Sequence, residues 1–262
     1  MVTSLALISD IHGNRLALEA VLADIDRRGV EATYSLGDIV GYGPDPNGAI
    51  DLLRERLIPS LAGNYDDGVG WERGECGCFY ATAEAKRIGD ASYAFTVAEV
   101  TPDRKAILRG LPTEMHITLD GIRLHLVHGS PRKINEYLLR DRDERTFVRL
   151  AEAEQDDVLV FGHTHDSWHR VVGGVLFVSV GSVGRPKDGD PRAMYTILSV
   201  TGGSSGEDRP ATTAEGEAVP EGEAIPISVE PVRVAYDVEA TARAVEDAGL
   251  PATLAEALRL GH

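Results

Sequence analysis

Seven polar side chains of the types that bind transition metals each come just after a short apolar run. They are Asp10, His12, Asp38, Asn64, His128, His163 and His165. Two pairs among them are spaced two residues apart, so in extended backbone both members of a pair point the same way. Carboxylate, imidazole and amide oxygen suit Mn²⁺, Fe, Zn²⁺ or Ni²⁺. Seven such groups exceed the needs of one ion and suit two ions that share a carboxylate, an arrangement that clamps the attacking and leaving oxygens in phosphoryl transfer.

The apolar runs that precede these residues predict strands, at 3–9, 32–36, 58–62, 123–127 and 158–161. Helices are expected between the first of them: Asn14 caps one, Gly29 ends it, and Asp45 with the following proline begins the next. Strands that alternate with helices predict an α/β fold whose sheet is largely parallel at its start. In such sheets the ligand crevice lies outside the carboxyl ends of the strands, which is where the seven polar groups fall.

The rest of the chain predicts a helical segment over 71–110, a set of paired strands and a C-terminal extension. Asp120 and Gly121 predict a tight hairpin turn. Gly, Pro and acidic residues dominate 202–226, which predicts a flexible loop or linker. The remaining strands are expected at 115–119, 168–172, 176–180, 194–200 and 227–235, and the last helices from Asp237 and from Pro251.

The composition narrows the class of protein. The 262 residues are 43% apolar, enough for a sizeable core, and no apolar run approaches the ~18 residues of a membrane-spanning helix. A formal charge of −16 repels nucleic acid polymers and anionic membranes, so we expect neither as a partner. The N-terminus has no positively charged leader, and Cys76 and Cys78 form neither a disulfide framework nor a zinc site. We therefore expect a cytoplasmic protein with inert cysteines.

Five motifs in order make the chain resemble the calcineurin-like metallophosphoesterase superfamily. Within it the chain is most similar to bacterial phosphodiesterases and diadenosine-polyphosphatase-like proteins. The motifs are DIHGN at 10–14, GDIVGY at 37–42, GNYD at 63–66, HG at 128–129 and GHTH at 162–165. The resemblance implies an α/β fold of four layers, an α/β/β/α sandwich, here with a small helical insertion and a C-terminal strand plus helices.

The chain is expected to divide into three parts. Residues 1–200 form the metallophosphoesterase domain, in which the helical insertion over 71–110 selects the substrate. Residues 201–226 form a flexible acidic loop, and the strand and helices of 227–262 pack on the same domain.

The resemblance also implies how the seven ligands divide. One metal would be held by Asp10, His12, Asp38 and His165, and the second by Asp38, Asn64, His128 and His163, with Asp38 as the bridge. The cofactor is then two divalent transition-metal ions, manganese first, with iron, zinc or nickel as alternatives. A metal-bridging hydroxide would attack phosphorus in line, which makes the chain a metal-dependent phosphoric ester hydrolase with Asp38, Asn64 and Tyr65 among its catalytic residues.

One residue departs from the family pattern. Many relatives have a histidine after the motif asparagine, where it is proposed to protonate the leaving group, whereas this chain has Tyr65. A phenol with a pKa of ~10 is a sluggish acid near neutrality, although it can still donate a hydrogen bond. Leaving groups that are already stable anions suffer least from this change. We therefore rank phosphodiester or phosphoanhydride cleavage of small nucleotides, such as diadenosine polyphosphates, above protein phosphatase activity.

The roles of three further residues stay open at this point. Asp66 is counted with the catalytic residues because it could orient Tyr65 or the hydroxide, but it could equally cap the next helix. Arg185 is a candidate phosphate clamp, since a guanidinium binds phosphate oxygens bidentately, or else a surface arginine. Asn14 is a second substrate-binding candidate. The histidines that match no motif are expected to be ordinary surface or strand residues: His116, His125, His169 and His262.

Two other functions compete with this hypothesis. A phosphomonoesterase or protein phosphatase of the same family would use the same ligands, and a non-catalytic metal-binding scaffold would keep them without turnover. A nuclease acting on DNA ends is disfavoured by the net charge. The complete ligand set favours an enzyme over a scaffold.

Overall fold

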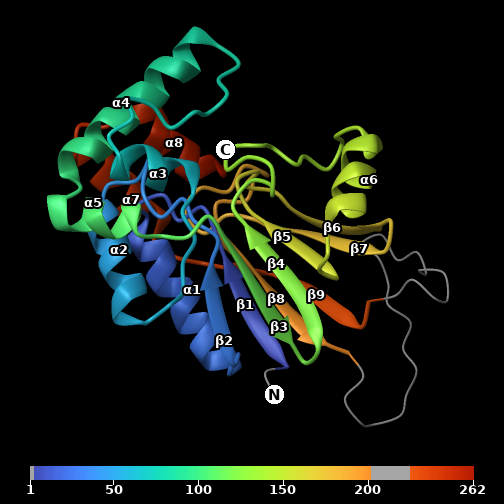
Figure 1. Ribbon diagram of the computed structural model, residues 1–262. Coiled ribbons are helices and arrows are strands. Elements are labelled where there is room, and N and C mark those ends of the chain that lie inside the picture. The colour runs from blue at the N-terminus through green and yellow to red at the C-terminus, as the bar shows by residue number, and fades with distance from the viewer. Residues whose placement is uncertain (1–2, 202–224) are drawn as a thin grey trace.

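Two β-sheets lie face to face between layers of helices in the computed structural model, which describes residues 3–201 and 225–262 (Figure 1). The four-stranded sheet has the order β2-β1-β8-β9, and the five-stranded sheet has the order β3-β4-β5-β7-β6. This arrangement confirms the predicted four-layer α/β/β/α fold. The strands are β1 (Ser4–Ile8), β2 (Ala32–Ser35), β3 (Glu114–Leu119), β4 (Ile122–Val127), β5 (Val158–Phe161), β6 (Ser167–Val172), β7 (Val175–Val180), β8 (Ala193–Val200) and β9 (Ile227–Val234).

The helices lie outside the two sheets. They are α1 (Arg15–Arg28), α2 (Pro46–Glu55), α3 (Asn64–Gly70), α4 (Ala83–Glu99), α5 (Pro102–Arg109), α6 (Glu144–Ala153), α7 (Val238–Asp247) and α8 (Ala252–Leu260). Helix α1 packs on the four-stranded sheet, and α6 packs alone on the far side of the five-stranded one (Figure 1). None of the helices in the described part of the chain has both the length and the apolar character that crossing a bilayer demands.

Strand β1 shows how alternation builds these layers. Its Leu5 and Leu7 enter the core between the two sheets, whereas Ala6 and Ile8 enter the core shared with α1. Strand β5 repeats the pattern between the inter-sheet core and the core under α6. Because both of these central strands are buried on both faces, packing fixes the positions of their ends. Each therefore delivers its following loop to a defined place.

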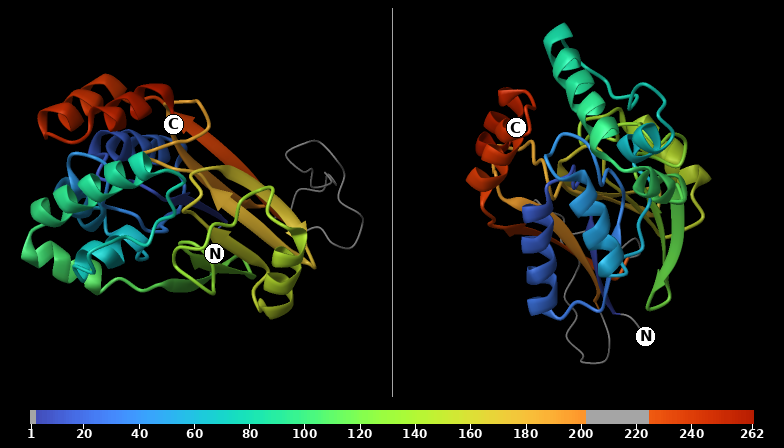
Figure 2. Two further views of the ribbon diagram at one scale, coloured as in Figure 1. Left: turned by 90° about the horizontal axis from the view of Figure 1, so that it is seen from above. Right: turned by 90° about the vertical axis from the view of Figure 1, so that its left-hand side faces the viewer.

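The C-terminal segment returns to the body of the protein. Strand β9 pairs antiparallel with β8 along its whole length. Helices α7 and α8 then form a small core of their own, against which Tyr42, Ile88 and Phe95 are packed (Figure 2). The loop expected over 201–226 falls almost entirely outside the described residues.

The expected elements differ from the structure in several places. The strand expected at 58–62 is reduced to a single bridge between Ser35 and Ser60, because Pro59 has no N–H to donate and the Ala62 N–H bonds Pro112 instead. The β1–β2 pair is parallel, but β8 joins β1 antiparallel, so the sheet is mixed. Residues 71–82 are not helical, and helices α3 and α6 were not expected.

Candidate metal centre

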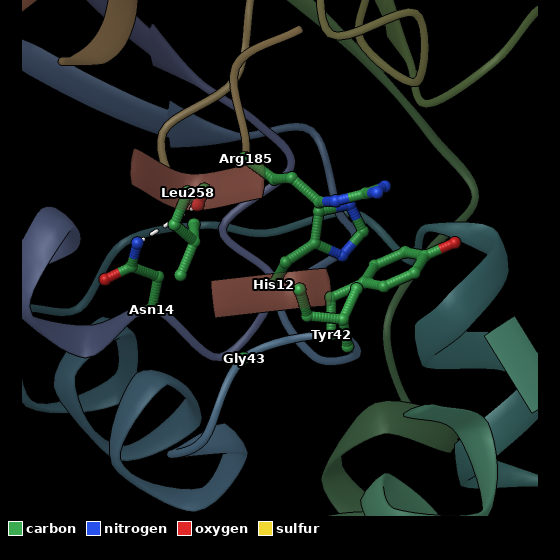
Figure 3. A pocket seen from close by; sticks show the side chains of 8 residues that line it. His12, Asn14, Tyr42, Gly43, Arg185 and Leu258 are labelled. Atoms are coloured by element: carbon green, nitrogen blue, oxygen red, sulfur yellow. Dashed lines mark hydrogen bonds between the residues drawn. The ribbon is translucent and has the colours of Figure 1, made fainter. Parts of the chain in front are cut away.

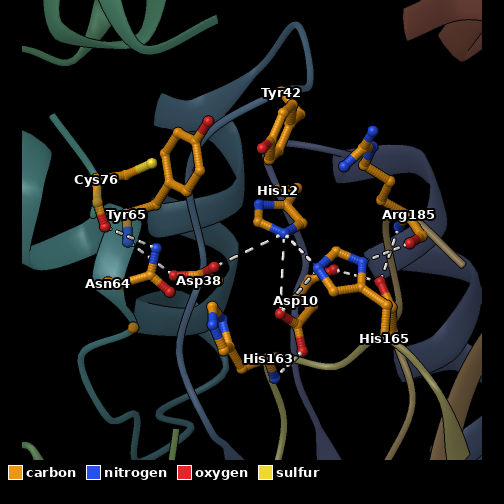
Figure 4. A network of polar contacts seen from close by, with 12 residues as sticks. Asp10, His12, Asp38, Tyr42, Asn64, Tyr65, Cys76, His163, His165 and Arg185 are labelled. Atoms are coloured by element: carbon orange, nitrogen blue, oxygen red, sulfur yellow. Dashed lines mark hydrogen bonds and ion pairs between the residues drawn. The ribbon is translucent and has the colours of Figure 1, made fainter. Parts of the chain in front are cut away.

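The seven predicted ligands come together beside the ends of strands from both sheets. Figure 4 labels all of them except His128. All seven are buried, none being more than 4% exposed. They are Asp10 and His12 after β1, Asp38 after β2, Asn64 at the start of α3, His128 after β4, and His163 and His165 after β5. The stacking of the sheets thus brings together residues up to 155 positions apart in the sequence.

The ligand atoms form two adjacent groups. Asp10, His12 and His165 each offer one atom within 4.8 Å of the other two, and so do Asp38, His128 and His163. Asp38 faces both groups, because its Oδ2 lies 3.8 Å from His12 Nε2 and 3.4 Å from His128 Nε2. The side-chain oxygen of Asn64 lies 3.2 Å from the same His128 nitrogen.

Backbone carbonyls fix the orientation of three imidazoles. The Nδ1 atoms of His12, His128 and His165 lie 3.1, 2.8 and 2.6 Å from the carbonyl oxygens of Val40, Leu36 and Arg185. Only a protonated nitrogen can donate to a carbonyl, so in the neutral ring each Nε2 carries a lone pair that points into the site. Such outer hydrogen bonds are typical of metal-ligating histidines.

Bound cations would satisfy these ligand atoms better than the ligand atoms satisfy one another. The Nε2 atoms of His12 and His165 lie only 3.2 Å apart, although both carry lone pairs in this tautomer. Asp10 Oδ1 and His163 Nε2 are buried without a hydrogen-bond partner among the described residues. Unpaired buried polar atoms are costly, and divalent ions at these positions would satisfy them.

Burial and mutual charge set the pKa values of these groups. Burial lowers the pKa of His12 and of His163 to about 3, so both rings are neutral near pH 7. Burial also raises the pKa of Asp10 to about 6. For His128 the effect of burial is outweighed by the Asp38 carboxylate, which raises the pKa to about 9. The second proton of the charged His128 ring, on Nε2, therefore competes with a metal ion for that nitrogen.

Five ligands have left-handed backbone. The φ angles of Asp10, His12, Asp38, His163 and His165 lie between 50° and 64°. This region is uncommon for residues with a Cβ atom and costs about 1–3 kcal/mol each, so it persists only where the surroundings impose it. The strained turns aim each side chain back across the strand ends.

Two glycines of the motifs are required by close approach. A Cβ atom on Gly63 would lie 2.1 Å from Asp38 Oδ1, and one on Gly162 would lie 2.0 Å from Ser9 Oγ and 2.9 Å from Asp10 Oδ2. Both positions directly precede a ligand. Any larger residue would push neighbouring ligands apart.

The Asp66 side chain binds backbone N–H groups of two neighbouring segments. Its carboxylate accepts hydrogen bonds from the N–H groups of Ile39, Val40 and Gly63, at 2.8–3.2 Å, and is completely buried. It thereby caps α3 and ties the loop of Asp38 to the start of this helix. Of the two roles considered from the sequence, these contacts match the one in which Asp66 caps a helix, and its catalytic role stays a prediction.

Tyr65 contacts the site through its backbone, since its N–H donates to Asp38 Oδ1 at 2.9 Å. Its hydroxyl lies on the far side of the ring from Asp38 and Asn64 (Figure 4), and it has no hydrogen-bond partner among the described residues. Burial raises the pKa of this phenol well above its ordinary value. The hydroxyl of Tyr65 is therefore buried and directed away from Asp38 and Asn64, and its hydrogen-bonding role stays a prediction.

Asn14 is also structural. Its side-chain oxygen accepts from the Ala17 N–H and from the Thr241 hydroxyl, and its amide nitrogen donates to Gly184 O and to the Tyr236 hydroxyl. The four hydrogen bonds that this amide can make are thus all used. Asn14 thus joins α1 to the C-terminal helix α7, and its role in binding substrate stays a prediction.

Arg185 lies beside the metal ligands. Its guanidinium carbon is 4.1 Å from the centre of the Tyr42 ring, and both residues line a small pocket next to His12 (Figure 3). No ion pair of this guanidinium is present within 3–201 and 225–262. Together with Lys187 it adds positive charge near the site, and both cations help burial to lower the pKa of His165.

Sequence reasoning missed four neighbours of the ligands. The amide of Asn64 donates to Cys76 O at 3.0 Å and contacts Cys78 Sγ at 3.2 Å, which turns its oxygen toward His128. The backbone carbonyl of Cys76 and the sulfur of Cys78 therefore orient a ligand, and the prediction that both thiols are inert stays a prediction. The rings of Tyr42 and Tyr137 pack on His12 and His163, with centroids 5.0 and 3.9 Å apart. Only Tyr42, between two motif glycines, carried a sequence signal.

Comparison with known proteins agrees with this geometry. A profile of the calcineurin-like phosphoesterase superfamily domain matches residues 4–203. Phosphodiesterase YfcE of Escherichia coli K12 is 26% identical over 74% of this chain and 86% of its own length.

Two other proteins are similar over almost the whole chain. The uncharacterized protein MJ0912 of Methanocaldococcus jannaschii is 29% identical over 98% of both sequences. The crystal structure of a metallophosphoesterase from Sphaerobacter thermophilus superposes with a TM-score of 0.72, at 28% identity and over 99% of both chains. The C-terminal segment is therefore part of the shared architecture with these two proteins.

Asp66→Ala should lower the free energy of unfolding by about 3 kcal/mol, because three buried N–H groups lose their acceptor. Urea denaturation measures this change. Asp67→Ala is the matched control: Asp67 is partly exposed and pairs with Arg73, and its loss should cost less than about 1 kcal/mol. Equal effects of the two substitutions would contradict the assigned role of Asp66.

Proposed function

Because the chain belongs to the calcineurin-like phosphoesterase superfamily of metal-dependent phosphoester hydrolases, we propose that it hydrolyses phosphodiester or phosphoanhydride bonds of small nucleotides at a centre of two divalent transition-metal ions. The observation that carries this proposal is the convergence of buried, unpaired ligand atoms in two groups that both face Asp38. A phosphodiesterase among its relatives supports this class of reaction.

The ligands divide between the two ions as their positions suggest. Asp10, His12, Asp38 and His165 hold one ion; Asp38, Asn64, His128 and His163 hold the other. Manganese is our first choice of metal, and the donor types also suit iron, zinc or nickel. When bound, such ions lower the pKa of water toward neutrality and neutralise charge on phosphate oxygens.

Side chains around the centre suit a small anionic substrate. Arg185, held against Tyr42, presents a guanidinium that can bind phosphate oxygens bidentately. Lys187 adds a second positive charge. These local cations counter a formal net charge of −16, so a phosphate group can approach this site although a nucleic acid polymer would be repelled.

The position of the segment between α3 and α4 supports the proposal that this segment selects the substrate. A pocket of about 560 Å³ opens beside Asn64 and is lined on one side by this segment. Its walls carry both aromatic and charged groups, among them Trp71, Arg73 and Glu75. We propose that this pocket receives the part of the substrate beyond the scissile bond.

The buried Tyr65 bears on the choice of leaving group. Since its phenol has a raised pKa and lies turned away from the ligands, this chain relies on leaving groups that depart as stable anions. Nucleotide phosphates and aryl oxides meet that need, whereas the alkoxide of a phosphoserine does not. This ranks phosphodiester and phosphoanhydride cleavage above phosphomonoester and protein phosphatase activity.

The manganese-loaded protein should cleave bis(p-nitrophenyl) phosphate and diadenosine tetraphosphate faster than p-nitrophenyl phosphate. Asn64→Ala should reduce kcat/KM at least about 100-fold because it removes a ligand. Asn47→Ala is the control: this amide of α2 donates to Glu99 O and accepts from the Thr101 N–H instead of facing the ligands, so the variant should match the wild-type kcat/KM. Faster monoester turnover would overturn the substrate ranking, and absence of turnover with both ions bound would favour a scaffold.

Arg185→Gln should raise KM about tenfold, equivalent to ~1.4 kcal/mol, with a smaller change in kcat, if the guanidinium binds substrate phosphate. Steady-state kinetics on the diester separate the two constants. The control Arg192→Gln removes an exposed arginine that pairs with Asp190 and should leave both constants unchanged. An unchanged KM in Arg185→Gln would remove this residue from the substrate site.

Affinity for Mn²⁺ should fall as the pH falls from about 9 to below 6. Both Asp10, with a pKa raised to about 6, and His128, with a pKa raised to about 9, take up protons that compete with the ion. Binding near pH 7 should therefore release protons. Calorimetry in buffers of different ionisation enthalpy measures that release, and pH-independent affinity would contradict the assignment.

A further inference from the structure

A second group of histidine and carboxylate side chains lies on the outer face of the five-stranded sheet, apart from the strand-end centre. Its central residue is His125 of β4. The flanking Leu124 and Leu126 enter the inter-sheet core, so alternation along the strand turns His125 to the opposite face. There it meets Glu154, the residue that ends α6, and Asp156 in the loop before β5.

The three side chains are close enough to share one ion. One ligand atom from each of His125, Glu154 and Asp156 lies within 4.8 Å of the other two. His125 Nδ1 is 2.9 Å from Glu154 Oε2. The exposed fractions of these side chains are 7%, 6% and 10%, so two carboxylates and an imidazole are held together largely out of water.

Two further residues contact this group from outside. Glu114 Oε2 lies 3.3 Å from His125 Nε2, the nitrogen that faces away from Glu154. His116, opposite His125 in the β3–β4 pairing, contacts Asp156 Oδ2 through its Nδ1. A carboxylate behind a ligating histidine and a hydrogen bond to a ligating carboxylate are the usual outer partners of a bound metal.

The charges around the group favour a cation. Of the arginines that line this pocket of about 430 Å³, Arg132 pairs with Glu136 and Arg149 donates to a backbone carbonyl. Arg123 is the nearest, with Nε 3.9 Å from Asp156 Oδ1, and it also faces Asp157. Although burial lowers the pKa of His125, the carboxylates of Glu154 and Glu114 outweigh this effect and raise it. The imidazole therefore sits in a negative field.

We propose that His125, Glu154 and Asp156 form a binding site for a divalent cation of the Zn²⁺ class, with Glu114 and His116 as its outer partners. One imidazole and two carboxylates give Zn²⁺ three protein ligands and leave a position open for water. The ion takes the place of the proton between His125 and Glu154. It joins the β3–β4 hairpin to the residue that follows α6 and to the loop before β5.

Equilibrium dialysis against Zn²⁺, followed by elemental analysis, tests this site. The wild-type protein should retain one zinc equivalent more than Asp156→Asn and Glu154→Gln, in which affinity at this site should fall at least about tenfold. His116→Ala should weaken the same equivalent without abolishing it. The matched control His169→Ala changes a histidine of β6 that has no such partners within the part of the chain that the structure describes, and it should retain the wild-type number.

Zinc bound at the strand-end centre does not affect this test, because the test measures only the difference in zinc content between the wild-type protein and the variants. His165→Ala, which impairs that centre, should still retain the additional equivalent. Circular dichroism shows whether each variant is folded. Equal zinc contents in the wild-type protein and in folded Asp156→Asn and Glu154→Gln would overturn the proposal and leave this group as a histidine–carboxylate ion pair.

Discussion

The structure depends on one electrostatic constraint: seven buried ligand side chains point their lone pairs and negative charge at a common space. The two Nε2 atoms 3.2 Å apart and the unpaired oxygen of Asp10 show that protein groups alone do not satisfy this arrangement. Divalent cations bound among these groups would satisfy it. The fold therefore has to hold mutually repelling groups in place until ions bind, and much of the surrounding structure serves that need.

Several kinds of contact hold the ligand side chains in place. Backbone carbonyls fix three imidazoles, and left-handed turns aim five of the ligands. Asp66 ties the loop of Asp38 to the start of α3, and Gly63 and Gly162 allow the chains to approach within contact distance of ligand oxygens. These supports rest on β1 and β5, which are buried on both faces and so cannot shift without disturbing two cores.

The surroundings of the centre also bear on its chemistry. Cations near the ligands make the site locally attractive to phosphate within a strongly acidic protein. The phenol that replaces the family histidine is buried, turned away and harder to ionise than usual. In the function we propose, this arrangement sorts substrates by how well their leaving groups carry charge. The helices α7 and α8, which pack against Tyr42, bring the C-terminal segment into the wall of the same site.

The sequence by itself determined the α/β class and the set of candidate ligands, because apolar runs are local patterns and strand ends gather at one edge of a sheet. Six of the seven ligands do follow a strand, whereas Asn64 begins α3. The four-layer arrangement was implied only by the motifs that resemble the family. Tertiary structure decided the rest. Whether Asp66 and Asn14 touch substrate or backbone depends on loops that only packing brings near. The direction of the Tyr65 hydroxyl depends on neighbouring rings, and the role of Cys76 and Cys78 depends on where α3 begins. His125, Glu154 and Asp156 carry no motif, since strand register and the end of α6 bring them together.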